Sequence, residues 1–251
     1  MKIYPDAQYT DPWLPGREID LFVPEGRCRH TVMWMHGGGL EAGSRKGFDG
    51  IAAQLCAEGI GFASVEYRMY PDAKFPDFLV DCAQAAAWLK ANAKRYGLSD
   101  RIVIGGSSAG AYISMMLCFA RQYLNDAGLQ PEDFDGYIFD AAQPTTHYNV
   151  LKYRGMDPRL CRVDEAAPLY YVDSARPGRP LSIIYAENDI PARPQQNDLL
   201  VATLRHFEYD MSLVSVTNMP GYGHCGYDEA KKDGRFILAD MIAEFVDRLD
   251  R

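Results

Sequence analysis

Two kinds of apolar pattern alternate along the chain. Short stretches rich in apolar and β-branched residues predict strands, and longer segments with apolar residues every three or four positions predict helices that pack against them. The predicted strands are 18–23, 31–35, 61–66, 101–104, 137–140, 181–186 and 212–216. The predicted helices are 48–58, 78–96, 109–123, 196–207 and 236–249.

The alternation predicts an α/β fold. Strands separated by helices pair in parallel through right-handed crossovers, so we expect a central, mostly parallel sheet with helices on both faces. A length of 251 residues suits one domain over residues 1–251 with a substantial core. Residues 141–179 hold prolines, glycines and aromatics without a clear period. This segment is either a small lid or cap insertion, or a surface excursion with short helices.

Composition and charge exclude several classes of protein. A net charge of −8 and the lack of a basic run argue against a nucleic-acid partner. The first residues lack the apolar stretch of a signal peptide, and no segment reaches membrane-spanning length, so we expect a cytoplasmic protein without a membrane partner. The six cysteines are scattered and predict reduced thiols, with no metal site. The oligomeric state is open, a homodimer included.

A G-x-S-x-G pentapeptide centred on Ser108 lies between the predicted strand 101–104 and the predicted helix 109–123. A tight turn between a strand and a helix presents a serine hydroxyl clear of the backbone, with small neighbours that leave room for a substrate. The start of the helix also directs free N–H groups and a positive dipole end at the hydroxyl. Ser108 is therefore a candidate nucleophile.

A serine nucleophile needs a base, and His224 is the candidate. It lies in a glycine-rich loop after the last predicted strand, where an imidazole reaches the carboxyl edge of the sheet. Of the other four histidines, His206 near a helix end is better explained as a partner of the helix dipole.

The base needs a carboxylate that orients it. Asp189 follows the predicted strand 181–186, and the order Ser108, Asp189, His224 is the one expected of α/β-hydrolases. Glu187 and Asp140 are rival acids. We favour Asp189, because Glu187 lies nearer the strand and Asp140 follows an earlier one.

The sequence His36-Gly37-Gly38-Gly39 follows the predicted strand 31–35. Glycines expose backbone N–H groups where side chains would collide with a substrate. We expect the N–H groups of Gly38, Gly39 and Ala109 to form an oxyanion hole for the charge that builds on a carbonyl oxygen in acyl transfer. His36 is then a structural hydrogen-bonding residue rather than a base.

Together these motifs resemble the esterase/lipase branch of the α/β-hydrolase superfamily, which includes hormone-sensitive-lipase-like and acetylxylan/feruloyl-esterase-like groups. The segment Glu66-Tyr67-Arg68-Met69-Tyr70-Pro71, with Phe75-Pro76 and Asp81, also resembles the branch. The resemblance implies that Ser108 is the nucleophile, His224 the base and then the acid, and Asp189 its orienter, with no cofactor. Only 35 residues precede His36, too few for an N-terminal helical cap, which favours the short acetyl- or feruloyl-esterase type.

The predicted function is that of a serine carboxylesterase, which hydrolyses short-chain or carbohydrate-linked esters through an acyl-enzyme. One alternative is an amide hydrolase of the same fold, such as an arylformamidase or a small peptidase. Another is a non-catalytic binding protein on a hydrolase fold. The expected partner is a small-molecule ester. Candidate substrate contacts, each of which is alternatively an ordinary core residue, are Leu40, Ser107, Tyr112, Tyr148 and Pro191.

Overall fold

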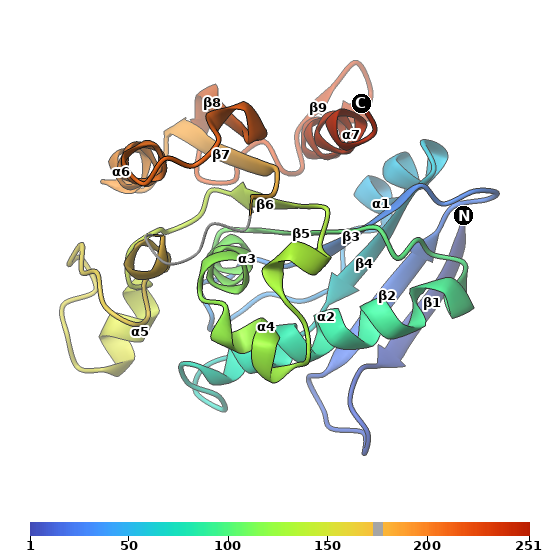
Figure 1. The fold of residues 1–251 in the computed structure, drawn as a ribbon, viewed down its shortest axis with the longest axis horizontal. Coiled ribbons are helices and arrows are strands. Elements are labelled where there is room, and N and C mark those ends of the chain that lie inside the picture. Colours follow the sequence, from blue (N-terminus) through green and yellow to red (C-terminus); the bar gives the residue numbers. More distant parts are fainter. Residues whose placement is uncertain (173–177) are drawn as a thin grey trace.

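The computed structural model describes residues 1–172 and 178–251, and its centre is an eight-stranded sheet (Figure 1). Strands β3 to β8 pair in parallel, whereas β2 pairs antiparallel with both β1 and β4. The predicted α/β class with a mostly parallel sheet is thereby confirmed. In spatial order the strands are β1 (Lys2–Gln8), β2 (Glu18–Val23), β4 (Ile60–Val65), β3 (His30–Met35), β5 (Ile102–Ser107), β6 (Gly136–Asp140), β7 (Leu181–Asn188) and β8 (Val214–Gly223).

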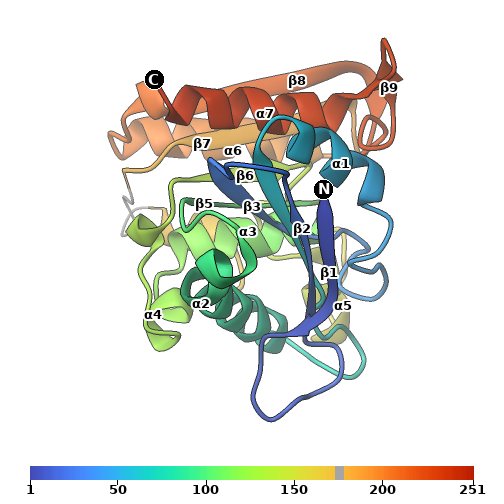
Figure 2. The same ribbon diagram turned by 90° about the vertical axis from the view of Figure 1, so that its right-hand side faces the viewer.

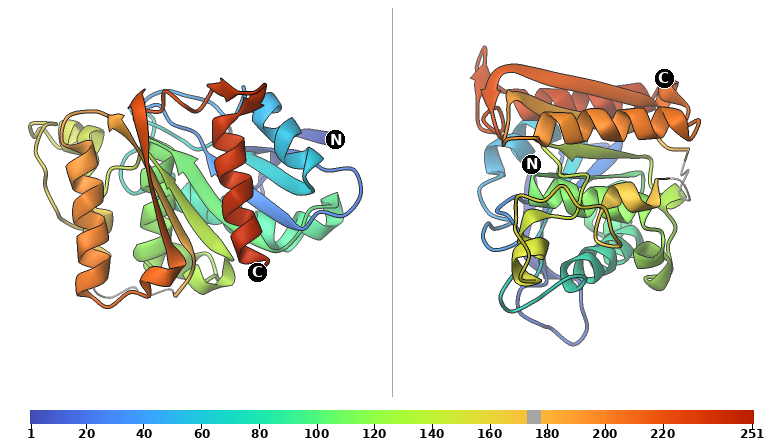
Figure 3. Two further views of the ribbon diagram at one scale, coloured as in Figure 1. Left: turned by 90° about the horizontal axis from the view of Figure 1, so that it is seen from above. Right: turned by 90° about the vertical axis from the view of Figure 1, so that its left-hand side faces the viewer.

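Helices cover the sheet on both faces (Figures 2 and 3). Helices α1 (Asp49–Ala57) and α7 (Ile237–Leu249) pack on one face, and α2 (Asp77–Tyr96), α3 (Ala109–Phe119) and α6 (Arg193–His206) on the other. Every residue of the central strand β3 is buried. Val32 and Trp34 join the core beneath α1 and α7, while Met33 and Met35 join the opposite core, as the two-residue period of a strand requires.

Several elements differ from their predicted bounds. The helix predicted over 109–123 ends at Phe119, because Ala120 leaves the helical region with ψ 77°, and α4 (Gln122–Asp126) follows separately. Strand β8 begins and ends later than predicted, so it carries the chain directly to His224. The sequence pattern predicted neither β1 nor the small hairpin of β9 (Lys231–Lys232) and β10 (Arg235–Phe236).

Residues 141–179 contain two short helices, α5 (Tyr148–Tyr153) and the 3-10 helix η2 (Pro168–Tyr171), and residues 173–177 lie outside the described part. Residues 141–147 are all buried. The Tyr112 hydroxyl of α3 donates to the carbonyl of Ala166 at 2.8 Å, so the described part of this segment is joined to the core. Whether it acts as a lid stays a prediction.

The remaining short elements lie between the strands and helices already named. They are the 3-10 helices η1 (Pro131–Asp133) and η3 (Met211–Leu213). All six cysteines are free, as the sequence predicted. No helix within the described residues is long and apolar enough to cross a bilayer.

Candidate active site

The turn between β5 and α3 places Ser108 at the carboxyl edge of the sheet. Ser108 adopts φ 54° and ψ −111°. Residues other than glycine rarely adopt this backbone conformation, and they keep it only where the surrounding structure enforces it. The flanking glycines allow the close packing. A Cβ on Gly106 would lie 2.6 Å from the carbonyl oxygen of Met35, and one on Gly110 would overlap the same carbonyl. The turn is therefore packed directly against the end of β3.

The side chains of Ser108, His224 and Asp189 form one line of hydrogen bonds. The Ser108 hydroxyl lies 2.8 Å from His224 Nε2, and His224 Nδ1 donates to Asp189 Oδ1 at 2.6 Å. The Asp189 side chain is fully buried, whereas that of His224 is 24% exposed. The backbone N–H of Ile190 also donates to Asp189 Oδ1 at 2.6 Å, which fixes the carboxylate toward the imidazole.

The extension of β7 and β8 explains how residues 189 and 224 meet. The two strands pair in parallel from Leu181 and Val214 to Asn188 and Gly223. Asp189 and His224 are therefore the residues that directly follow a paired position at the same edge of the sheet. Neighbouring parallel strands end together, so side chains 35 residues apart in sequence come within hydrogen-bonding distance.

The rival acids and the other histidine candidate lie elsewhere. Glu187 accepts a hydrogen bond from the backbone N–H of Gly221 at 2.8 Å and so braces the extended strand pair. His206 is exposed at the end of α6. Asp140 is fully buried and accepts a hydrogen bond from the Ser107 hydroxyl at 2.6 Å. None of the three rivals contacts the hydroxyl of Ser108.

The glycine loop after β3 lies against Ser108. A Cβ on Gly37 would lie 3.3 Å from Ser108 Cβ, and Gly38 and Gly39 have φ values of 114° and 67°. Asn149 of α5 donates to the Gly39 carbonyl at 2.5 Å, which holds the loop in place. Among the described residues, the backbone N–H groups of Gly38, Gly39 and Ala109 have no hydrogen-bond acceptor.

His36, at the start of the glycine loop, is held by contacts of both ring nitrogens and of the ring face. Its Nδ1 donates to the Gly37 carbonyl at 2.7 Å, its Nε2 lies 2.9 Å from Glu66 Oε1, and its ring stacks on Tyr67 with centroids 4.4 Å apart. Burial raises the pKa of Glu66, but the hydrogen bonds from His36 and Arg45 outweigh it and hold this pKa below its usual value. These contacts agree with the structural role predicted for His36.

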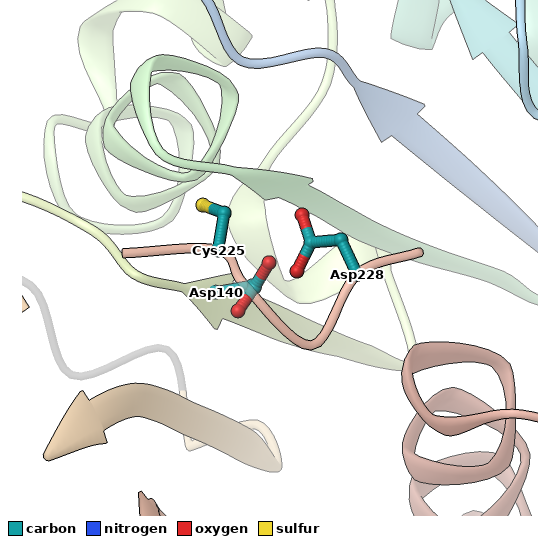
Figure 4. Close-up of side chains that lie close together, drawn as sticks. All are labelled: Asp140, Cys225 and Asp228. Atoms are coloured by element: carbon teal, nitrogen blue, oxygen red, sulfur yellow. The ribbon is translucent and has the colours of Figure 1, made fainter. Parts of the chain in front are cut away.

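Sequence reasoning missed an acidic cluster of Asp140, Cys225 and Asp228, in which Asp140 is buried and the other two residues are half-buried (Figure 4). Ligating atoms of Asp140, Cys225 and Asp228 all lie within 4.8 Å of one another. Asp140 accepts hydrogen bonds from the hydroxyls of Ser107, at 2.6 Å, and Tyr227, at 2.5 Å. Burial, together with the charge of Asp140, raises the pKa of Asp228 to about 9. The two carboxyl groups therefore hold a proton at neutral pH.

The acidic cluster links two parts of the site. Ser107 immediately precedes Ser108, and Cys225 immediately follows His224. Both oxygens of Asp140 are already occupied by hydroxyl donors, and burial raises the pKa of the Cys225 thiol. Protonated groups of this kind are poor metal ligands. Asp228 carries no motif that sequence reasoning could have used, whereas Asp140 was considered only as a rival acid.

Two cavities adjoin at Tyr148 and Ile190, which line both. The first, of about 440 Å³, contains Ser108, His224 and the glycine loop, and we call it the serine cavity. The second, of about 500 Å³, lies between α5 and the start of α6, and we call it the side cavity.

The five candidate substrate contacts separate into two groups. Tyr148, Pro191 and Ser107 line one or both cavities. Leu40 and Tyr112 line neither, and both are fully buried in the core. Their proximity in sequence to the motifs was misleading: a φ of 65° turns Leu40 away from the loop surface, and Tyr112 lies inside α3 with all its neighbours buried.

A model of the BD-FAE family matches residues 19–150, more than half of the chain. The chain belongs to the BD-FAE family. This match includes the glycine loop, the serine turn and Asp140 but stops before residues 189 and 224. The predicted resemblance to α/β-hydrolase esterases is confirmed at the level of the family.

Two curated relatives match nearly the whole chain. Esterase LipQ of Mycobacterium tuberculosis is 27% identical over 96% of the chain and 62% of its own length. Esterase LipC of the same organism is 27% identical over 98% of the chain and 63% of its own length. The chain thus spans less than two thirds of these relatives.

Solved structures share the fold at low sequence identity. A truncated carbohydrate esterase from gut microbiota has a TM-score of 0.79 at 16% identity, covering 100% of this chain and 97% of that one. Thermogutta terrifontis esterase 2, phosphoramylated by tabun, has a TM-score of 0.77 at 15% identity, covering 98% and 94%. The protein therefore has the α/β-hydrolase fold.

Proposed function

We propose that the protein is a serine carboxylesterase. The observation that carries this proposal is the line of hydrogen bonds from Ser108 through His224 to Asp189 at the floor of an open cavity. A serine hydroxyl is a weak nucleophile unless a base accepts its proton and a third group orients that base.

The reaction would proceed in two halves. In the first, Ser108 Oγ attacks the ester carbonyl carbon while His224 Nε2 takes the hydroxyl proton, and Asp189 stabilises the imidazolium that forms. The imidazolium then gives this proton to the leaving alcohol, and the acyl group stays on Ser108. In the second, His224 takes a proton from water as the water attacks the acyl carbon, and the imidazolium then returns this proton to Ser108 Oγ as the acid leaves.

The glycine loop would stabilise the negative charge that develops in each half. The N–H groups of Gly38 and Gly39 come from the loop, and that of Ala109 from the first turn of α3, whose dipole adds to the effect. Loss of one such donor typically slows an enzyme about 10²- to 10³-fold. The backbone around these glycines is held by Asn149, so the donors are in place before a substrate binds.

The proposed substrates are short-chain or carbohydrate-linked esters. The names of the relatives support ester hydrolysis in general, and one structural neighbour is described as a carbohydrate esterase. A cavity of about 440 Å³ that is open to solvent suits a small acyl group on a larger alcohol better than a long alkyl chain.

Hydrolysis of p-nitrophenyl acetate tests the proposal. We expect turnover by the wild-type protein and a loss of at least 10³-fold in Ser108→Ala, with Ser212→Ala as the control because Ser212 is exposed and lines neither cavity. Undiminished turnover in Ser108→Ala would exclude Ser108 as the nucleophile. A panel of esters, N-formyl aryl amides and peptides separates an esterase from an amide hydrolase. Faster cleavage of the amides would show that the protein is an amide hydrolase and would contradict the proposal.

A further inference from the structure

The side cavity contains a buried arginine. Arg193, the first residue of α6, lines this cavity and is only 3% exposed. Its guanidinium donates to the carbonyl of Ala141 at 2.8 Å and to the side-chain oxygen of Gln143 at 3.2 Å. A guanidinium carries five N–H donors, so these two neutral acceptors satisfy only part of its capacity.

No described residue forms an ion pair with Arg193. Asp189 is the acidic group whose charge acts most strongly on it, but neither carboxylate oxygen bonds to Arg193: Oδ1 is held by His224 and Ile190, and Oδ2 is buried without a hydrogen-bond partner. Burial lowers the pKa of Arg193, as expected for a cation that is removed from water without an ion-pair partner. Buried charges are normally paired, so a counter-charge from outside the chain would complete the site.

The start of α6 adds to the positive character of the cavity. Pro191 and Ala192 line it together with Arg193, and the N-cap residue Ala192 has no side chain that could accept a hydrogen bond from the first turn. In the first turn Pro194 has no N–H group, and the N–H groups of Arg193 and Gln196 donate to the carbonyls of Ile190 and Ala192. The N–H of Gln195 and the dipole of this 14-residue helix therefore favour an anion at its N-terminus.

The other residues that line the side cavity indicate which kind of anion would bind beside Arg193. Within the described residues no aspartate or glutamate lines the side cavity, although the chain as a whole carries a net charge of −8. Its second arginine, Arg159, is exposed and paired with Asp157. Gln143, Cys161 and Gln196 also line the cavity, and the other lining residues are mostly apolar: Tyr148, Pro158, Leu160, Ile190, Pro191 and Ala192. One buried cation in a mostly apolar cavity suits a carboxylate on an alkyl or aryl body better than a heavily hydrated group.

We propose that the side cavity binds a carboxylate of the substrate, so that the protein acts preferentially on esters whose acid or alcohol part carries a carboxylate on an apolar body. This proposal rests on the proposed ester hydrolysis. Tyr148 and Ile190 line both cavities, so a substrate can place its ester at Ser108 and its carboxylate at Arg193. The Arg193 fork matches the two oxygens of a carboxylate.

Two matched pairs of esters test the proposal. In the first pair the carboxylate is on the acid part: mono-4-nitrophenyl glutarate against 4-nitrophenyl pentanoate. In the second it is on the alcohol part: 4-acetoxybenzoate against 4-methylphenyl acetate. In each pair a carboxylate replaces a methyl group. The quantity measured is the ratio of kcat/KM, charged ester over neutral ester, in the wild-type protein, in Arg193→Met and in Arg193→Lys.

We expect this ratio to fall ten- to a hundredfold in Arg193→Met for at least one pair, the range typical of losing a hydrogen bond to a charged group. Arg193→Lys should retain part of the preference, because it keeps the charge but not the fork. Arg205→Met is the matched control, since Arg205 is exposed on the same helix and its ratio should equal that of the wild type. A ratio that Arg193→Met leaves unchanged in both pairs overturns the proposal.

Inhibition of the wild-type protein keeps the test decisive if Arg193→Met does not fold. Inhibition constants of 4-methylbenzoate and 4-methylbenzamide are compared with p-nitrophenyl acetate as substrate. We expect the carboxylate to bind at least tenfold more tightly than the amide, and equal binding overturns the proposal. Failure of ester hydrolysis itself is recognised separately, because Ser108→Ala would then leave the turnover of every ester unchanged.

Discussion

The raised pKa of Asp228, which lies beside Asp140, leads to a prediction about stability and pH. The pKa of Asp228 is about 9 in the folded protein, against 3.8 as the ordinary value that an unfolded chain approaches. Between these two values the folded pair holds a proton that the unfolded chain has lost, so the free energy of unfolding falls as pH rises. The stabilisation from this proton is complete below pH 3.8 and is lost as pH rises toward 9.

The magnitude follows from the same numbers. One proton contributes about 1.4 kcal/mol per pH unit, so this pair would lower the free energy of unfolding by at most about 4 kcal/mol between pH 5 and pH 8. Asp228→Asn removes the titration but keeps the shape of the side chain. We therefore expect the variant to become progressively more stable relative to the wild type over this range.

Equilibrium unfolding in urea at pH 5, 6, 7 and 8 measures the effect. The difference between the two proteins cancels the titration of groups that are common to both. Glu229→Gln is the control, because residue 229 is exposed and the substitution removes one carboxylate beside the cluster without changing Asp228. The difference in free energy of unfolding between this variant and the wild type should not change with pH. A flat difference for Asp228→Asn as well would show that the cluster holds no proton, and the reasoning would fail.

Three further substitutions test the geometry of the site. Asp189→Asn should lower kcat by about 10⁴-fold, because the amide no longer holds the imidazole in the correct tautomer; steady-state kinetics at pH 7 measure it, and a loss below tenfold would contradict the role. Gly39→Ala should lower kcat about 10²- to 10³-fold, because the residue has φ 67° and a Cβ would displace the Tyr148 side chain and shift the loop; full activity in a variant that is folded would contradict the loop's role as the oxyanion hole. Gly110→Ala should lower Tm by several degrees, because its Cβ would overlap the Met35 carbonyl, a backbone atom that cannot move alone; an unchanged melting curve would contradict this packing.

The sequence contained enough information to predict the serine turn and its partners. Ser108, Asp189 and His224 each follow a strand, and strand ends were readable from apolar runs bounded by glycines or acidic residues. In a parallel sheet, residues that follow strand ends converge whatever their separation along the chain. The general argument therefore placed three distant residues in one site without any knowledge of register.

Other features depend on contacts that no local pattern records. The pKa of Asp228 is raised because the chain after β8 brings this residue beside Asp140 at the end of β6, and nothing near residue 228 in the sequence indicates this. Arg193 was missed for a related reason: the predicted helix began at residue 196, so residue 193 was assigned to a loop, where an arginine is ordinarily exposed. Its burial follows from the packing of residues 141–143 over the start of α6.

The choice of candidate substrate contacts relied on proximity in sequence to a motif. Proximity in sequence to a motif says little about which side of a turn a residue occupies. Leu40 follows the glycine loop directly, yet its positive φ directs it into the core. Tyr148, more than a hundred residues from that loop, is the residue whose hydroxyl packs against Gly39.

Covalent labelling by a fluorophosphonate probe tests most directly whether Ser108 is an activated nucleophile. We expect one equivalent of probe per chain, attached to Ser108, with labelling abolished in Ser108→Ala and strongly slowed in His224→Gln. Labelling at another serine, or equally rapid labelling of the His224→Gln variant, would contradict the account.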